Sequence, residues 1–437
     1  MLTLLQLLIV VAMILIGAKK GGIALGIYGM VGVFILVFGF GLEPGAIPVD
    51  VMLVIVCVIT ASAALQSAGG LDYMVKAAAR FLKRHPSRIT FYGPLVTWFF
   101  SIVAGTAHTC YALLPIISEI ARKDKVRPER PLSVATISAS LGCTGSPVSA
   151  ATAAILSEEI LGSKGIGMYD IMMVTIPASI IAILVASLVQ NYVGKPLDKD
   201  PEYLRRIQEG LLSDDDVDTD ETTTGNPRAK WAVVAFLLGV VMVVLFGIFP
   251  ELRPAFNGNA LNMSTTIEII MMSIAALILL VGKADVREAM KGNVFASGMN
   301  AMVSIFGIAW MGSTFFEGHH EKILGSVEGV FTSYPLLFAI PLFLFSIMLF
   351  SQAATVKTLY PVGLAMGVPP MVLLVLFPVV NGYFFLPNYP TEVAAIGFDR
   401  TGTTGIGKYV VNHSFQLSGW ITTIVSIGVG YLIMTLL

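Results

Sequence analysis

Long apolar segments with at most one charged residue recur along the whole of this 437-residue chain. Each is about 16–24 residues long, which is enough for a helix to cross a hydrocarbon layer about 30 Å thick. The chain is 56% hydrophobic and 13% charged, whereas soluble domains carry about 25% charged residues. The pattern predicts an all-α polytopic membrane protein, whose clear spans are 2–17, 22–41, 51–68, 171–193, 231–249, 264–282, 294–315 and 415–436.

The composition gives no sign of a metal, a cofactor or a nucleic-acid partner. The net charge is -1. Cys57, Cys110 and Cys143 lie inside apolar segments without the spacing of metal ligands. The first apolar segment lacks a preceding basic region and is followed by Lys19 and Lys20. That order of charges is the reverse of a signal peptide, so we expect a retained first span.

Two apolar segments, 89–121 and 334–366, are too long for one span and have polar centres. The centres read AGTAHTC and SQAATVK. Small and hydroxyl residues at mid-membrane interrupt a helix, and such backbone is tolerated where it is buried in protein or lines a cavity. We therefore expect two re-entrant hairpins, each made of two half-length helices that meet at a polar tip.

Two further segments, 131–155 and 369–396, break at GCTGSP and LPNYPT. Proline removes a backbone donor and glycine loosens a helix. These segments are predicted to be spans interrupted near the midplane.

The charges of the loops indicate the orientation of the spans. With the N-terminus outside, ten spans and two hairpins place 23 of the 27 Lys and Arg residues in inside loops and three in outside loops, and leave Lys357 over. The predicted inside loops are 17–22, 69–88, 119–130, 194–230, 283–293 and 397–413, and the outside loops carry Lys164, Arg253 and Lys322. This bias follows the positive-inside rule. It predicts periplasmic N- and C-termini and a cytoplasmic linker over 194–230.

The order of three spans, a hairpin, a broken span and a span occurs twice, in opposite orientations. It predicts an inverted repeat with halves 1–193 and 231–437. A faint local match follows each break, SPVSAA in the first half and YPTEVAA in the second. The linker 194–230 carries ten acidic and six basic residues, so we expect a solvated and partly disordered segment. A regulatory contact there, and any sensor partner, stay open.

Inverted repeats with hairpins and broken helices are typical of secondary transporters. The N-terminus of a half-helix carries unpaired N–H groups and about half a positive charge, which favours anions. The polar centres also offer many donors and few carboxylates, which suits an anionic substrate. The candidate substrate-binding residues are Thr106, His108, Thr109, Thr144, Ser146, Ser149, Ser351, Gln352, Thr355, Lys357, Asn388 and Thr391.

Lys357 is the charged residue that most needs an explanation. A lysine at mid-membrane costs about 2.5–3.5 kcal/mol on insertion scales. Three interpretations are open: contact with a carboxylate substrate, an internal pair with Glu392, or snorkelling to an interface. His108 is either a hydrogen-bonded structural residue or a group that contacts substrate or handles protons. No catalytic triad, zinc motif or paired-carboxylate site is present, so we do not expect an enzyme.

The chain resembles the Dcu family of bacterial anaerobic C4-dicarboxylate transporters over essentially its whole length. The segments that carry the resemblance are, in order, GGIALGIYGMVGV, SAGGLDYMVKAAARFLKRHP, AGTAHTCYALLPIISEIA, RPLSVATISAS, SPVSAA, FSQAATVKTLYP, LPNYPT and DRTGTTGIGKYVVNHSF.

The resemblance implies exchange of fumarate, malate, aspartate or succinate across the inner membrane by a dimeric, elevator-type carrier of the ion-transporter superfamily. His108 stands where similar sequences often have asparagine, and Glu392 where an apolar residue is common. The predicted function is electroneutral antiport, in which Lys357 and the half-helix dipoles balance the substrate charge. The rivals are a proton- or sodium-coupled symporter, a cation/proton antiporter and a membrane enzyme. The glycines of GAKKGGIALGIYG (Gly17 to Gly29) are interpreted as close helix packing rather than a nucleotide loop.

Overall fold

A computed structural model describes residues 2–20, 23–47, 49–212, 226–256, 259–319, 330–349, 351–386, 389–407 and 412–436. The first half consists of helices α1 (Leu2–Lys20), α2 (Ala24–Phe34), a π-helical turn η1 (Ile35–Gly39), α3 (Val49–Ser67), α4 (Gly70–Lys83), η2 (Pro86–Arg88), α5 (Ile89–Ala104), η3 (Ala107–Thr109), α6 (Cys110–Lys123), α7 (Glu129–Gly145), α8 (Ala150–Leu156), η4 (Gly162–Lys164) and α9 (Met168–Gln190). The linker adds η5 (Leu197–Lys199) and α10 (Pro201–Gln208).

The second half begins with a long apolar helix and contains one small antiparallel strand pair. Its elements are α11 (Ala229–Ile248), η6 (Pro250–Leu252), β1 (Ala255–Phe256), β2 (Asn259–Ala260), α12 (Met263–Gly282), α13 (Val286–Lys291), α14 (Asn293–Glu317), α16 (Val330–Ser333), η7 (Pro335–Phe338), α17 (Ala339–Leu349), α18 (Gln352–Ala365), α19 (Pro370–Val375), η8 (Phe377–Phe385), α20 (Pro390–Phe398) and α21 (Gln416–Leu436).

The predicted all-α, multi-pass character is confirmed. Within the described ranges, six helices are long and apolar enough to cross a membrane, or up to eight if each of two bent helix pairs counts as one span. The N-terminal helices α1 and α2 and the helix α17 are shorter apolar helices. Ten spans therefore stay a prediction.

One of the bent pairs lies where the sequence predicted a simple loop. The segment 69–88 contains α4, which follows α3 at a bend of 70°. Gly69 has φ +74°, a left-handed conformation that glycine adopts without strain. Apolar residues line one side of α4 and basic residues the other, so this charged segment forms an amphipathic helix rather than irregular chain.

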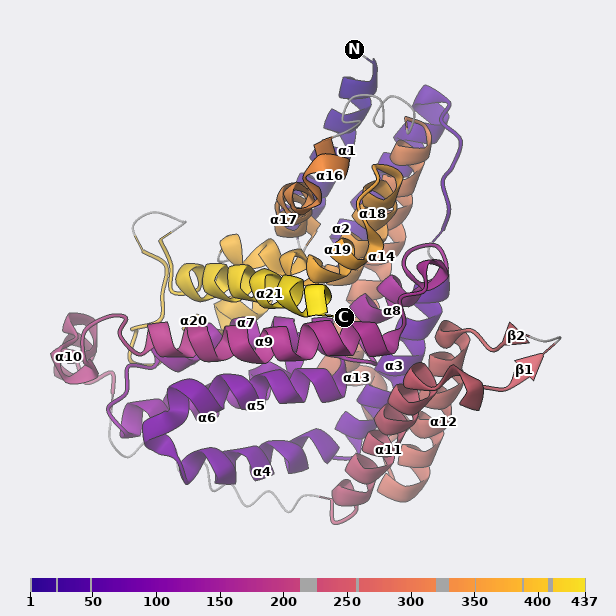
Figure 1. The fold of residues 1–437 in the computed structure, drawn as a ribbon. Helices are drawn as coiled ribbons and strands as arrows, with labels where there is room; N and C mark the ends of the chain where they lie inside the picture. The colour runs from indigo at the N-terminus through magenta and orange to yellow at the C-terminus, as the bar shows by residue number, and fades with distance from the viewer. Residues whose placement is uncertain are drawn as a thin grey trace.

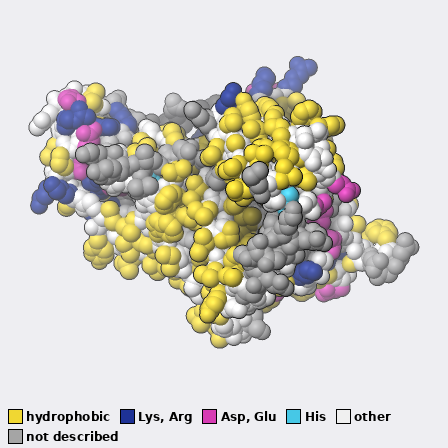
Figure 2. Space-filling model, turned by 90° about the horizontal axis from the view of Figure 1, so that it is seen from above, with side chains coloured by type: hydrophobic (Ala, Val, Ile, Leu, Met, Phe, Trp, Pro, Cys, Tyr) yellow, Lys and Arg dark blue, Asp and Glu magenta, His cyan; other side chains and the backbone are white. Residues whose placement is uncertain are grey.

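The helices pack in two groups (Figure 1). In one group α5, α7, α9 and α21 lie side by side, and each contacts the next. In the other, α14 packs on α2 and α3, and α12 packs on α3 and α11. A view from above shows apolar side chains gathered across the middle of the visible face, with most Lys and Arg side chains near its edges (Figure 2). This distribution is what a protein embedded in lipid requires.

The close contact of α2 with α14 confirms the interpretation of the glycine-rich N-terminal segment. A Cβ atom at Gly26 would lie 2.0 Å from the carbonyl oxygen of Val303, and one at Gly307 would lie 1.8 Å from that of Gly26. No side chain fits at either position, so glycine is what allows the two backbones to touch.

Candidate functional site

The chain folds back on itself at both predicted tips. A Cβ atom at Gly93 of α5 would lie 3.2 Å from Ile117 of α6, so these two helices run antiparallel around the tip at 105–109. One at Gly363 of α18 would lie 2.8 Å from the ring of Phe338, just before α17. The second pair is therefore also antiparallel. The re-entrant placement of both pairs in a membrane stays a prediction.

The first tip is packed directly on the break between α7 and α8. The Ser146 hydroxyl donates a hydrogen bond of 2.6 Å to the carbonyl of Ile102 in α5. Gly105 has φ +69°, and a Cβ atom there would lie 2.6 Å from the carbonyl oxygen of Val148. The tip and the break consequently form one rigid unit.

Within this tip, local hydrogen bonds fix the polar side chains. Thr106 is extended and caps η3, where its hydroxyl accepts a 3.3 Å hydrogen bond from the backbone N–H of His108 and lies 3.2 Å from Nδ1 of that ring. Thr109 donates to the carbonyl of Thr106 at 3.2 Å. Thr106 and His108 also line a cavity of about 100 Å³ between this tip, α3 and α14. Ser62 of α3 is a further polar residue in the lining of this cavity.

The second tip joins three elements. Ser351 caps α18 by accepting a hydrogen bond of 3.3 Å from the N–H of Ala354, and Thr355 donates to the Ser351 carbonyl at 2.8 Å. Gln352 donates to the carbonyl of Ser140 in α7 at 2.8 Å and to Asn381 of η8. The amide of Gln352 therefore holds the start of α18 against both broken segments.

The second break carries the polar groups with unused hydrogen-bonding capacity. Tyr389 stacks on Tyr383 with ring centroids 4.1 Å apart. Thr391 and Glu392, in the first turn of α20, are each 1% exposed. The Thr391 hydroxyl and one Glu392 oxygen have no hydrogen-bond partner in the described part of the chain. Asn388, also predicted for the site, lies outside the described residues.

Two predicted residues have hydroxyls that are already used inside the fold. Thr144 donates to the carbonyl of Leu141 at 2.7 Å. Ser149 caps α8, because its hydroxyl accepts from the N–H of Thr152 at 3.0 Å. Ser149 thereby marks the N-terminus of a half-helix rather than offering a free hydroxyl.

Four helix N-termini gather around the C-terminal half of α7. They belong to η3 with α6, to α8, to α18 and to α20, and each begins at a tip or a break. The contacts of α7 with η3, α8 and α20, and the bond from Gln352 to Ser140, hold them together. Each N-terminus presents unpaired N–H groups and a partial positive charge. The arrangement suits a ligand with separated negative groups.

Lys357 departs from this arrangement, and the acid beside it is not the predicted one. Its ammonium lies 2.9 Å from a carboxylate oxygen of Glu159 and 3.3 Å from the Ser157 hydroxyl. Pairing with Glu392 is thus wrong for this structure. The reason is that α18 packs on α8, which brings Lys357 beside the chain that follows α8, whereas Glu392 lies on α20 between α6 and α7.

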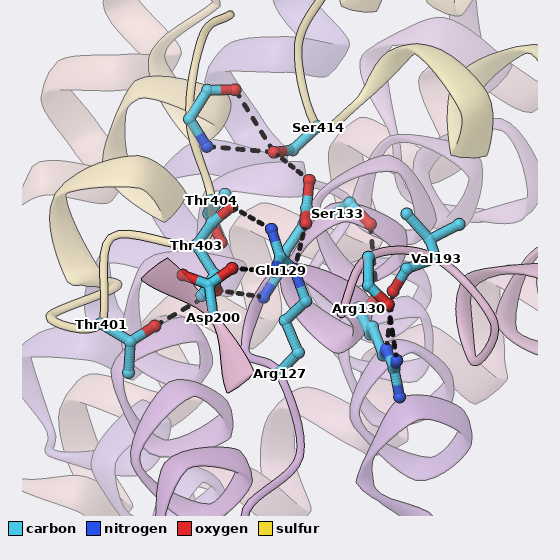
Figure 3. A network of polar contacts seen from close by, with 12 residues as sticks. Arg127, Glu129, Arg130, Ser133, Val193, Asp200, Thr401, Thr403, Thr404 and Ser414 are labelled. Atoms are coloured by element: carbon cyan, nitrogen blue, oxygen red, sulfur yellow. Dashed lines mark hydrogen bonds and ion pairs between the residues drawn. The ribbon is translucent and has the colours of Figure 1, made fainter. Parts of the chain in front are cut away.

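A polar cluster that was not predicted from the sequence joins three predicted inside loops (Figure 3). Arg127 forms ion pairs with Glu129 and with Asp200 of the linker, and donates to the carbonyl of Thr403. Ser414 donates to Glu129 at 2.7 Å. Burial works to lower the pKa of Arg127, but the two carboxylates outweigh it and raise that pKa. The segment DRTGTTGIGKYVVNHSF, noted above only for its resemblance, supplies one side of this cluster.

Comparison with known proteins decides the family. A family model described as an anaerobic C4-dicarboxylate membrane transporter matches residues 2–437. The chain belongs to this family. The resemblance drawn from the sequence is therefore confirmed.

Named relatives in the family match nearly end to end. The anaerobic C4-dicarboxylate transporter DcuB of Escherichia coli O6:H1 is 41% identical over 441 residues, which cover 99% of this chain and 98% of the relative. The C4-dicarboxylate transporter DcuA of Wolinella succinogenes is 37% identical, with 99% of each chain covered. DcuA of Escherichia coli K12 is 39% identical, with 98% of each covered. These relatives are transporters, which confirms the prediction that the chain is not an enzyme.

Among solved structures, the Alcanivorax borkumensis YdaH transporter superposes with a TM-score of 0.49 at 15% identity, covering 87% of this chain and 84% of that one.

Proposed function

We propose that the protein exchanges C4-dicarboxylates such as fumarate, malate, aspartate and succinate across the bacterial inner membrane. Its family and its near-complete match to named C4-dicarboxylate transporters support this substrate class. The antiport mechanism is inferred from the composition of the site. It follows from a site rich in donors and positive helix ends, which balances a dianion without a bound metal cation.

The observation that carries the proposal is the convergence of four half-helix N-termini around α7. A dicarboxylate has two anionic groups, and N–H groups at helix N-termini bind such groups well. Ser149 and Ser351 cap two of these helices. Thr391 is 1% exposed, and its hydroxyl, which has no hydrogen-bond partner among the described residues, offers a donor at a third. In this proposal the substrate lies between the two tips, and Lys357 contributes the positive charge beside them.

The transport cycle proposed here is of the elevator type. The inverted repeat of residues 1–193 and 231–437, ten spans, periplasmic termini and a homodimer belong to the same proposal. The twofold order of elements, in which a helix pair with a tip precedes a broken helix, supports the repeat. The cluster that joins Arg127, Asp200 and Thr403 supports the orientation, since these residues come from three loops predicted to lie on the cytoplasmic side.

A second candidate is a proton- or sodium-coupled symporter. It is favoured by one observation: Glu392 is 1% exposed with an oxygen that lacks a hydrogen-bond partner in the described ranges. A buried carboxyl group of this kind is stable when a proton or a cation neutralises it. Ion coupling through Glu392 is therefore the alternative to exchange.

Uptake of labelled succinate into proteoliposomes separates the two candidates. Vesicles are preloaded with fumarate, with aspartate or with buffer, and assayed with and without sodium and at fixed pH gradients. We expect uptake that requires internal dicarboxylate and is the same with and without sodium. Uptake into buffer-loaded vesicles driven by an ion gradient would establish the symporter instead. Protein-free vesicles give the background.

A further inference from the structure

Lys357 and Glu159 form an ion pair with a marked difference in exposure. The Lys357 side chain is 5% exposed, whereas the Glu159 side chain is 56% exposed. The ammonium nitrogen and the nearer carboxylate oxygen are 2.9 Å apart. The lysine is thus buried within the protein, while its partner lies at the protein surface.

The groups around the Lys357 ammonium favour a positive charge. Ser157 accepts from it at 3.3 Å and donates its own proton to the carbonyl of Ala154 at 2.8 Å. Ser157 also directly follows α8, whose C-terminal end carries partial negative charge. A buried ammonium that loses its counter-ion leaves an uncompensated charge, which is strongly destabilising. Lys357 is therefore more stable with an anion beside it, which in this structure is Glu159.

The direction of the side chain places this contact beside the tips rather than among them. Lys357 follows Gln352 by five residues, and at about 100° per residue it points about 140° away from it around α18. Gln352 faces α7 and η8, while Lys357 faces the chain after α8. Because Glu159 is exposed, this contact is on the side of Lys357 that is nearest to the protein surface.

We propose that Glu159 is a competing carboxylate: it occupies Lys357 in the empty transporter and is displaced by a carboxylate group of the arriving substrate. Glu159 and a C4-dicarboxylate carry the same functional group, so one replaces the other without leaving the lysine unpaired. The half-exposed glutamate returns to water at small cost, because ion pairs of exposed side chains contribute little. Glu159 thereby sets the affinity for substrate as a positioning residue for Lys357.

This inference rests on the proposed function, and a neighbouring residue supplies a matched control. Glu158 is exposed and forms no ion pair among the described residues, so Glu158→Gln removes the same charge without the contact. The variants Glu159→Gln, Glu158→Gln and Glu159→Asp are compared with the unchanged chain for KM and kcat of succinate exchange in fumarate-loaded proteoliposomes. Aspartate keeps the charge on a shorter side chain, which weakens the pair.

Glu159→Gln is expected to lower KM about two- to fivefold, which corresponds to the upper part of the range for loss of one partly exposed ion pair. Glu158→Gln should change KM by less than about twofold, since a screened surface charge acts weakly at a distance. A merely structural pair predicts the opposite sign, because damage to the fold lowers kcat or raises KM. If Glu159→Gln does not fold, Glu159→Asp supplies the test, with a smaller fall in KM expected.

The results distinguish the proposed role of Glu159 from the proposed exchange function. Exchange with an unchanged or raised KM in Glu159→Gln, or in Glu159→Asp where that variant replaces it, overturns the role of Glu159 and leaves the exchange function standing. An equal fall in KM for Glu158→Gln also overturns the role of Glu159, since that result attributes the effect to local surface charge rather than to the ion pair. Failure of the unchanged chain to exchange any C4-dicarboxylate overturns the proposed function together with this inference.

Discussion

Gly105→Ala tests whether contact between the first tip and the first break holds the substrate site together. Gly105 has φ +69°, and a left-handed conformation costs an L-residue about 1–2 kcal/mol. The new Cβ atom would lie 2.6 Å from the carbonyl oxygen of Val148. The tip and the break must separate by about 0.8 Å to restore an ordinary contact. Forced expansion of a packed contact adds about 1–3 kcal/mol.

The expected loss of folding free energy is therefore about 2–5 kcal/mol for Gly105→Ala. Gly165→Ala is the matched control, because Gly165 has φ +80° and no atom lies within 4 Å of its added Cβ. It should lose about 1–2 kcal/mol, from backbone strain alone. Thermal unfolding in detergent and succinate binding are measured for both. Equal destabilisation, with parental affinity in both variants, would refute the rigid tip–break unit.

Three further predictions concern the rest of the molecule. Gly307→Ala places a Cβ atom 1.8 Å from a backbone oxygen and should cost about 3 kcal/mol of stability. The control Gly428→Ala has no described atom within 4 Å of its Cβ and should change stability by no more than about 1 kcal/mol. Similar unfolding temperatures for the two variants would contradict the packing argument. Burial lowers the pKa of His413, so the unfolded chain binds a proton more readily and the unfolding temperature should fall as pH drops below about 6.5; a His413→Gln variant with the same slope would refute this. Arg127→Gln leaves Asp200 without its ion pair and should increase hydrogen–deuterium exchange in α10, and parental exchange rates there would show that the cluster does not anchor the linker.

The sequence predicted the helical, membrane-embedded character because hydrophobic length is a local property. The polar centre at 104–110 and the break at 142–147 were visible for the same reason, since each interrupts an apolar run with glycine, proline or hydroxyl residues. Glycine packing near Gly26 was likewise readable from spacing. In contrast, α4 was missed because its basic residues resembled a loop, although they occupy one side of an amphipathic helix.

The contacts of Lys357 were not predictable, because they join residues far apart in the chain. Glu159 lies 198 positions away from it and belongs to a short segment that the sequence assigned to an outside loop. Only the packing of α18 on α8 brings them together. The cluster around Arg127 has the same origin, since Asp200 and Thr403 reach it from two other loops.

The most direct test of the account is an experimental structure of the protein with bound succinate. We expect density for one dicarboxylate between the two tips, with one carboxylate at the N-terminus of α8, α18 or α20 and the other directed toward Lys357. The Lys357 ammonium should have left Glu159 for an oxygen of that second carboxylate. Succinate bound away from both tips, with those helix N-termini unoccupied, would contradict the proposed site.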